Sequence, residues 1–187
     1  MAQLMNNAGL IVANELFKDR LPALGQNILR LGVTNTIITS YQAQEFPRPH
    51  QFDHVMADVP CSGEGNFRIG PKVREHRVWN LERLITHQRR IIIRAYELLR
   101  PNGTMLYSTC TYNPFENEAI VAYLLENSDA ELIPFDPPIR SEPGLTGWLS
   151  KGFHPNLSMA RRFYPHHTGS VGFFVAYIRK PGKRADL

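Results

Sequence analysis

The chain has 187 residues, which is enough to bury the core of one domain. Hydrophobic residues make up 43% and charged residues 20%, a composition that excludes a disordered or fibrous protein. The 21 Lys and Arg exceed the 17 Asp and Glu, which favours a polyanionic partner but also suits an ordinary solvated surface. No apolar run reaches the ~18 residues of a membrane span, and the N-terminus lacks a signal-peptide pattern. We therefore expect a cytoplasmic protein without a membrane partner.

The first part of the chain alternates helical and strand patterns. Residues 1–7 are expected to end a helix, and the apolar run of residues 9–14 suits a buried parallel strand. Apolar residues spaced by three and four predict a helix over residues 18–31, closed by Gly32. Residues 34–41 predict a second strand.

The middle of the chain repeats this alternation. Residues 52–59 predict a third strand that Pro60 ends, so a glycine-containing loop begins at the carboxyl end of that strand. The helical spacing of apolar residues over residues 81–99 predicts the longest helix, stopped by the Pro-Asn-Gly of residues 101–103. Residues 104–109 predict a fourth strand.

The last third of the chain contains one helix and one strand by its pattern. Asn113 and Glu116 form a capping-box pattern before a helix that runs to Leu125. Residues 136–168 are rich in Pro, Gly and His and are expected to be irregular, whereas residues 172–180 predict a last strand. Strands that alternate with helices predict an α/β fold with a mostly parallel sheet covered on both faces. Ligands of such a sheet bind at the carboxyl ends of its strands.

The chain has two cysteines, Cys61 and Cys110, and each follows a predicted strand. Without a secretory signal a disulfide is not expected, and each cysteine taken alone would be a small buried hydrophobic residue. The carboxyl ends of neighbouring parallel strands meet at one edge of a sheet. We therefore expect the two thiols to lie at the same edge.

The sequences around the two cysteines carry a family resemblance. DVPCSGEG surrounds Cys61, and YSTCT surrounds Cys110 and runs on into NPFENE. Both motifs, each after a strand and in this order, resemble the RNA cytosine-5 methyltransferase family, and most of all its bacterial small-subunit ribosomal-RNA members. Residues 9–15 resemble the ribose-binding strand of that family, and residues 172–174 resemble its closing strand.

The resemblance implies a fold, a cofactor and a partner. The fold would be the Rossmann-like sheet of class I methyltransferases with helices on both faces. The cofactor would be S-adenosyl-L-methionine, with no metal, and the partner RNA, ribosomal rather than transfer RNA. We assign residues 1–180 to this catalytic domain, as a partial domain, and residues 181–187 to a loose tail. The first strand of the family and its glycine-rich cofactor loop do not occur in the sequence and are expected upstream of residue 1.

The chemistry of cytosine methylation explains the residue types. Carbon 5 becomes nucleophilic when a soft nucleophile adds to carbon 6, and a thiolate suits that step. By resemblance, Cys110 is the nucleophile, and Cys61 assists proton removal or enzyme release. Asp58 stands at a strand end, where a carboxylate favours a protonated ring nitrogen and also borders the cofactor. The alternative for Asp58 is a turn carboxylate that binds nearby backbone amides.

Two further residues are candidates for the cofactor site. Glu15 follows the first strand, where an acidic side chain can accept both ribose hydroxyls. Without the family resemblance, Glu15 would be an ordinary acid at the entry of a helix. Gln42 stands where the family has an aspartate that accepts the adenine amino group, and an amide oxygen can also accept that hydrogen bond.

Basic residues near both motifs are candidates for RNA contacts. Arg68 and Lys72 follow the Pro-Cys loop, and Arg161 and His166 precede the last strand, so both pairs could line the rim around a flipped base. The alternative is that these are solvated surface residues. Tyr112 could stack on a base or pack in its loop.

Two other functions compete with methylation of cytosine. A non-catalytic RNA-binding or interaction module could keep the fold, although the intact thiols and carboxylate favour an enzyme. Amino-methylation of adenine or guanine would require an Asn or Asp followed by Pro-Pro and an aromatic residue, where this chain has DVPC.

Overall fold

The computed structural model describes residues 1–48, 51–69 and 80–182, with residues 67–69 described by their backbone alone. The chain divides into two compact units, Met1–Phe46 (unit 1) and Pro47–Leu187 (unit 2). The predicted tail lies mostly outside the described residues. No helix in the described part of the chain is long and apolar enough to cross a bilayer.

Unit 1 contains a two-stranded parallel sheet and one helix. Strand β1 (Ile11–Asn14) pairs with β2 (Thr36–Thr39), and helix α1 (Leu21–Arg30) connects them. These elements confirm the predicted pattern with shorter bounds. The helix begins late because a proline stands in its first turn, where its missing N–H costs nothing. It is followed by Gly32 in the left-handed conformation, at φ +63°. The short 3₁₀ helix η1 (Ala43–Glu45) follows β2.

The prediction that residues 1–7 end a helix is wrong. The amide of Met5 donates a helical hydrogen bond to the carbonyl of Met1 over 3.0 Å, but the segment forms turns. Asn6 and Asn7 adopt φ values of 50° and 56°. Asparagine tolerates this left-handed conformation, and two such residues in succession prevent a helix from continuing.

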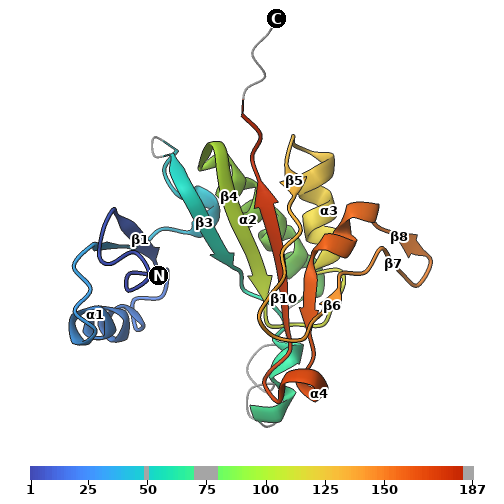
Figure 1. The fold of residues 1–187 in the computed structure, drawn as a ribbon, viewed down its shortest axis with the longest axis horizontal. Coiled ribbons are helices and arrows are strands. Elements are labelled where there is room, and N and C mark those ends of the chain that lie inside the picture. The colour runs from blue at the N-terminus through green and yellow to red at the C-terminus, as the bar shows by residue number, and fades with distance from the viewer. Residues whose placement is uncertain (49–50, 70–79, 183–187) are drawn as a thin grey trace, which may run out of the picture. The chain divides into compact units, whose positions relative to one another are not determined.

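Unit 2 is built on a mixed sheet with the strand order β3, β4, β10, β9, β6 (Figure 1). Strand β5 pairs with Ile178 and Arg179 at the end of β10, beyond the residues that pair with β9. The elements are β3 (Phe52–Asp58), η2 (Glu64–Ile69), α2 (Leu81–Glu97), β4 (Leu99–Thr109), α3 (Glu118–Glu126), β5 (Glu131–Leu132), β6 (Glu142–Pro143), β7 (Gly147–Trp148), β8 (Lys151–Gly152), η4 (Pro155–Met159), β9 (Arg161–Phe163), α4 (Pro165–Thr168) and β10 (Phe173–Arg179).

The strand directions confirm the α/β fold but correct the expectation of a mostly parallel sheet. Strands β3 and β4 are parallel, as predicted, whereas β10 is antiparallel to both β4 and β9. The connection between β9 and β10 spans only residues 164–172. A parallel crossover needs a dozen or more residues, so these two strands must run antiparallel. Strand β9 lies in the segment that was expected to be irregular.

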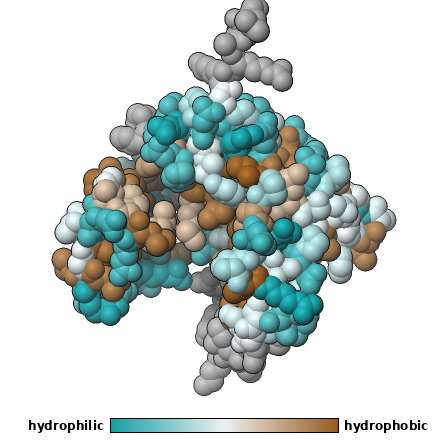
Figure 2. All heavy atoms as spheres, viewed as in Figure 1, coloured by the Kyte–Doolittle hydropathy of each residue, from teal (hydrophilic) through white to brown (hydrophobic). Residues whose placement is uncertain are grey.

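One face of this sheet packs on helices α2 and α3, which lie behind it in Figure 1. Met105 and Tyr107 of β4 and Ala176 of β10 are fully buried on that face. On the opposite face, the paired residues Met56 and Leu106 are 57% and 36% exposed. Figure 2 shows apolar side chains on this face. Within the described residues, β3 pairs with β4 alone and β1 with β2 alone.

The Pro-Asn-Gly segment does not separate helix and strand as predicted. Helix α2 ends at Glu97, and β4 begins at Leu99, which pairs with Phe52 before a register shift in the ladder. Asn102 has φ +63°, and its amide donates to the carbonyl of Lys180 over 2.9 Å. The segment is therefore an irregularity inside the strand, where a proline is tolerated.

The predicted capping box is also wrong. Helix α3 begins at Glu118, and residues 114–117 form a turn before it. The side chain of Asn113 accepts a hydrogen bond from the amide of Phe115, as a cap would. In a capping box, Glu116 would accept the backbone amide of Asn113. That amide instead donates to the hydroxyl of Thr111 over 3.2 Å. The carboxylate of Glu116 instead turns inward to the Pro-Cys loop.

Candidate active site

The two cysteines meet at the carboxyl ends of the parallel strands β3 and β4. The Sγ atoms of Cys61 and Cys110 are 3.3 Å apart, and both residues are half-buried. The residues that follow them are also joined, because the hydroxyls of Ser62 and Thr111 lie 2.8 Å apart. The structure thus brings together the two thiols that the sequence places after neighbouring strands.

The loop after Cys61 folds back onto Cys110. The amide of Gly65 donates to the carbonyl of Cys110 over 2.9 Å, and the amide of Gly172 donates to the carbonyl of Gly65 over 3.0 Å. A Cβ on Gly65 would collide with the carbonyl oxygens of Gly172 and Cys110, so this close approach requires glycine. The next residue, Asn66, donates from Nδ2 to the Sγ of Cys110 over 3.2 Å. Sequence reasoning missed Asn66, since nothing in its residue type or position signals a thiol partner.

These contacts make the two thiols unequal. Hydrogen bonds from the thiol of Cys61 and the amide of Asn66 lower the pKa of Cys110 to about 6, against burial and the negative charge of Asp58. The pKa of Cys61 is raised, because its proton is held by Cys110 and because it is buried. At neutral pH this arrangement favours a thiolate at Cys110 and a thiol at Cys61.

Asp58 ends β3 and is exposed beside the thiols. Its Oδ1 accepts a hydrogen bond from the hydroxyl of Ser108, on the neighbouring strand β4, over 3.1 Å. Its hydrogen-bond partner is therefore a side chain and not a turn amide, which disfavours the alternative role of a turn carboxylate. The exposed carboxylate is available to a ligand at the strand ends.

The buried carboxylate of Glu116 holds the Pro-Cys loop in place. Its Oε2 accepts hydrogen bonds from the amide of Ser62 over 2.8 Å and from Nε2 of Gln88 over 3.0 Å. The same Nε2 donates to the carbonyl of Pro60 over 2.8 Å. The hydroxyl of Tyr107 donates to the carbonyl of Glu116 over 2.7 Å. Both Gln88 and Glu116 are fully buried, so the loop that carries Cys61 is held by a network that excludes water.

A buried ion pair fixes the segment after Cys110. The guanidinium of Arg162 donates from Nε and Nη2 to the two oxygens of Glu118 over 2.7 and 2.5 Å, and from Nη1 to the carbonyl of Tyr112 over 3.0 Å. Arg162 lies on β9, one residue after the predicted RNA contact Arg161. Because side chains alternate along a strand, Arg161 points elsewhere, and its Nε donates to the carbonyl of Phe135 over 3.2 Å.

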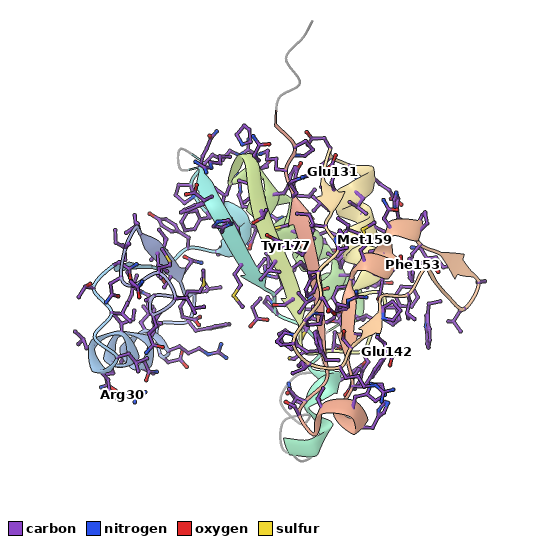
Figure 3. The ribbon with its side chains drawn as sticks, in the orientation of Figure 1. Arg30, Glu131, Glu142, Phe153, Met159 and Tyr177 are labelled. Carbon is purple, nitrogen blue, oxygen red and sulfur yellow. The ribbon has the colours of Figure 1, made fainter. Side chains whose placement is uncertain are left out.

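Three aromatic rings extend from the second motif toward the surface. Tyr112 stacks on Tyr164 with ring centroids 5.7 Å apart, and Tyr164 stacks on His166 with centroids 5.5 Å apart. Tyr112 lies over Gly172, where a Cβ would overlap its ring. His166 is exposed, so the outer end of this stack is open to solvent. Its neighbour His167 lies 3.5 Å from Glu142, which is labelled on β6 in Figure 3.

The predicted cofactor residues outside unit 2 lie at one edge of the unit 1 sheet. Glu15 follows β1, and its Oε1 accepts the amide of Phe17 over 2.9 Å. Gln42 follows β2, and its Oε1 accepts Nε2 of Gln44 over 2.7 Å. Glu15 therefore bonds to its own turn, which also suits the alternative role of an ordinary acid at the entry of a helix. Both residues retain oxygen lone pairs that can accept further hydrogen bonds.

Two of the predicted RNA contacts are beyond what the structure describes. The backbone of Arg68 lies in η2, and its side chain is outside the described part, as is all of Lys72. Among the described residues, no group of three or more His, Cys, Asp or Glu could hold a metal ion.

Comparison with known proteins identifies relatives over almost the whole chain. The chain is 35% identical over 185 residues to the tRNA (cytosine(49)-C(5))-methyltransferase of Pyrococcus abyssi, covering 97% of this chain and 59% of that protein. It is 37% identical over 186 residues to the ribosomal RNA small subunit methyltransferase F of Escherichia coli O139:H28, covering 96% and 37%. The curated relatives are longer, and the chain spans 23% to 59% of their length.

The fold has the same relatives. The structure of NSun6 from Pyrococcus horikoshii matches with a TM-score of 0.79 and 32% identity, covering 96% of this chain and 43% of that one. The family model of 16S rRNA methyltransferase RsmB/F matches residues 1–179. The Rossmann-like methyltransferase fold expected from the sequence is thereby confirmed. Since that match includes both cysteine motifs and nearly every residue, the chain belongs to the 16S rRNA methyltransferase RsmB/F family.

Proposed function

We propose that the protein containing this chain transfers a methyl group from S-adenosyl-L-methionine to carbon 5 of cytosine in RNA, with ribosomal RNA as the substrate. The observation that carries this proposal is the pair of thiols 3.3 Å apart at the ends of β3 and β4. Their pKa values are shifted in opposite directions. A nucleophilic thiolate beside a protonated thiol supplies the two groups that covalent methylation of cytosine requires.

Cys110 attacks carbon 6 of the base in this proposal. A bond forms between Sγ and carbon 6, the electron pair of the ring double bond moves toward carbon 5, and the ring nitrogen holds a proton with the help of Asp58. Carbon 5 then takes the methyl group that the cofactor supplies. Loss of the proton on carbon 5 restores the double bond and expels Cys110 as a thiolate, which completes the cycle.

The hydrogen bond between the thiols suits Cys61 to the removal of that proton. Before attack, Cys61 keeps its own proton because the charge of Cys110 holds it there. Once the sulfur of Cys110 is bonded to carbon 6, its negative charge is gone, and the pKa of Cys61 falls toward the ordinary value for a thiol. Cys61 can then release its proton to water, and the thiolate that remains accepts the proton of carbon 5 at the stage when a base is needed.

The cofactor site is proposed from Glu15, Gln42 and Asp58. Glu15 and Gln42 follow the parallel strands β1 and β2 of unit 1, and Asp58 ends β3 of unit 2. Each of these side chains is a hydrogen-bond acceptor, which suits ribose hydroxyls, the adenine amino group and the methionine amine. The NSun6 relative was solved with SFG, an analogue of the cofactor. The fit to this chain rests on the acceptor chemistry of its own residues.

The RNA contacts are proposed at the outer rim of the site. The stack of Tyr112, Tyr164 and His166 ends in an exposed ring, on which a base next to the target can stack. Arg161, Arg68 and Lys72 are proposed to contact the RNA backbone, in line with the positive formal charge of the chain. Ribosomal RNA is favoured by the matched family, although the relatives include an enzyme named for tRNA.

Covalent trapping tests the proposed function in the full-length protein. Cys110→Ala should abolish both methyl transfer and the formation of a protein-RNA adduct, because Cys61, the other cysteine of the chain, is not expected to attack carbon 6. In Cys61→Ala, Cys110 should still attack carbon 6, but loss of the carbon-5 proton should be slow, so a protein-RNA adduct should accumulate on denaturing gels. Retained methylation in Cys110→Ala would refute the covalent mechanism, and normal turnover without adduct in Cys61→Ala would refute the role of Cys61.

A further inference from the structure

Two side chains among the described residues form hydrogen bonds with the sulfur of Cys110, and they are Cys61 and Asn66. The Nδ2 of Asn66 lies 3.2 Å from that sulfur, and the sulfur of Cys61 lies 3.3 Å from it. An amide N–H is a donor, and sulfur accepts weakly as a thiol but strongly as a thiolate. The contact therefore favours the ionised form of Cys110 over its neutral form.

The backbone around Asn66 aims its amide at the sulfur. Asn66 is the third residue of η2, and its backbone amide donates to the carbonyl of Gly63 over 3.0 Å, which closes the first turn. The preceding residue, Gly65, is held to the backbone of Cys110 by a hydrogen bond of 2.9 Å. These two backbone hydrogen bonds hold the segment that carries the side-chain amide of Asn66 next to Cys110. Such preorganisation lets a hydrogen bond act without a cost of reorganisation during the reaction.

The two donors to Cys110 differ in one chemical respect. The thiol of Cys61 titrates, and its proton leaves the pair if Cys61 acts as a base, whereas the amide of Asn66 never ionises. The amide is therefore the donor that persists through the whole cycle. It faces a thiolate twice, before attack on carbon 6 and again when Cys110 is expelled from the product.

We propose that Asn66 is a catalytic hydrogen-bond donor that holds Cys110 as a thiolate before attack and stabilises the same thiolate as the leaving group. The proposal rests on the proposed role of Cys110 as nucleophile. The low pKa of Cys110 agrees with it, since the amide of Asn66 is one of the groups that lower it. The negative charge of Asp58 raises the pKa of Cys110, and the amide of Asn66 opposes that effect.

The test measures the thiolate at Cys110 directly. The rate of alkylation by iodoacetamide is followed against pH, and peptide mapping by mass spectrometry separates Cys110 from Cys61. Asn66→Leu removes the donor at similar volume, and Asn66→Asp replaces the amide by an anion of nearly the same shape. Asn156→Leu, at an exposed position in η4, is the matched control.

The wild-type midpoint is expected near pH 6, in line with the lowered pKa of Cys110. Loss of one hydrogen bond to a charged group should raise it by about one unit in Asn66→Leu, which is about fivefold less thiolate at pH 6. Asn66→Asp should raise the midpoint further, because a second negative charge faces the sulfur. Asn156→Leu should leave it unchanged.

Unchanged midpoints in folded Asn66→Leu and Asn66→Asp would overturn the role of Asn66. If Asn66→Leu does not fold, as judged by circular dichroism, Asn66→Asp decides the question, because its side chain differs from asparagine mainly in charge. The outcome is independent of the proposed function. If the Asn66 variants shift the midpoint but the full-length protein methylates no RNA, the donor role of Asn66 stands and the proposed methyl transfer is refuted. If Cys110→Ala abolishes methylation but the Asn66 variants leave the midpoint unchanged, the methyl transfer stands and the donor role is refuted.

Discussion

Replacing Arg162 by methionine should strongly destabilise unit 2, because it leaves a buried charge without its partner. The side chains of Arg162 and Glu118 are 4% and 0% exposed. Three hydrogen bonds from the guanidinium are lost, two to Glu118 and one to the carbonyl of Tyr112. One donor to the carboxylate remains, the amide of Leu145 at 2.9 Å. Removal of one partner of a buried ion pair costs about 3 to 5 kcal/mol, and we expect a loss in this range.

The double variant separates the charge from the packing. In Arg162→Met with Glu118→Gln, no charge remains buried, and the uncharged pair fills a similar volume. Much of the lost stability should return, leaving a deficit of about 1 to 2 kcal/mol for the unpaired carbonyl of Tyr112. The coupling energy of the cycle is the summed cost of Arg162→Met and Glu118→Gln minus the cost of the double variant, and it should therefore be at least about 1 kcal/mol.

Chemical denaturation followed by circular dichroism gives these free energies of unfolding. Arg179→Met is the control, since Arg179 also donates from Nε and Nη2 to a carboxylate, both to Oε2 of Glu131 on the adjacent strand β5, but at 53% and 50% exposure. That exposed pair should contribute below about 1 kcal/mol. If Arg162→Met and Arg179→Met cost the same, burial does not set the energy of these pairs and the reasoning fails.

Glu116→Ala should lower the free energy of unfolding by about 2 to 4 kcal/mol, because the amides of Ser62 and Gln88 lose their buried acceptor; denaturation that matches wild type would contradict this. Alkylation of Cys110 should slow as the pH falls through about 6, since its lowered pKa means that the thiolate is the form lost on acidification, and a midpoint near the ordinary thiol pKa would refute it. In the full-length protein, His166→Ala should weaken RNA binding by about 1 to 3 kcal/mol through lost stacking, whereas His54→Ala, exposed on β3, should not; equal effects would remove His166 from the interface.

The parts of the fold that the sequence predicted are those in which pattern and packing agree. Apolar periodicity located α1, α2 and the strands β1 to β4 within a few residues. The short strand β9 was missed because its three residues, Arg-Arg-Phe, contain two charged side chains and no alternating apolar pattern. Its place in the sheet comes from its pairing with β10 and from the buried ion pair of Arg162 with Glu118. Both contacts join residues far apart in the sequence, so the local pattern of residues does not reveal them.

The site was predictable to the extent that strand ends determine it. The approach of Cys61 to Cys110 follows from topology, because both follow neighbouring parallel strands. The role of Glu116 was mistaken for a helix cap, because its spacing from Asn113 satisfies the capping pattern equally well. A carboxylate that serves a residue 54 positions away leaves no trace in local sequence.

Topology alone makes Cys61 and Cys110 equivalent, since each is a thiol just beyond a strand end. Their difference comes from the first turn of η2, which brings Gly65 and Asn66 back to Cys110. Among the side chains that the structure describes, the one that forms a hydrogen bond with the thiol of Cys61 is Cys110, and the pKa of Cys61 is raised and not lowered. The glycine that permits this return has no space for a Cβ. Gly65 therefore helps decide which sulfur is the thiolate without touching either one, and Gly65→Ala should move the alkylation midpoint of Cys110 in the same direction as Asn66→Leu.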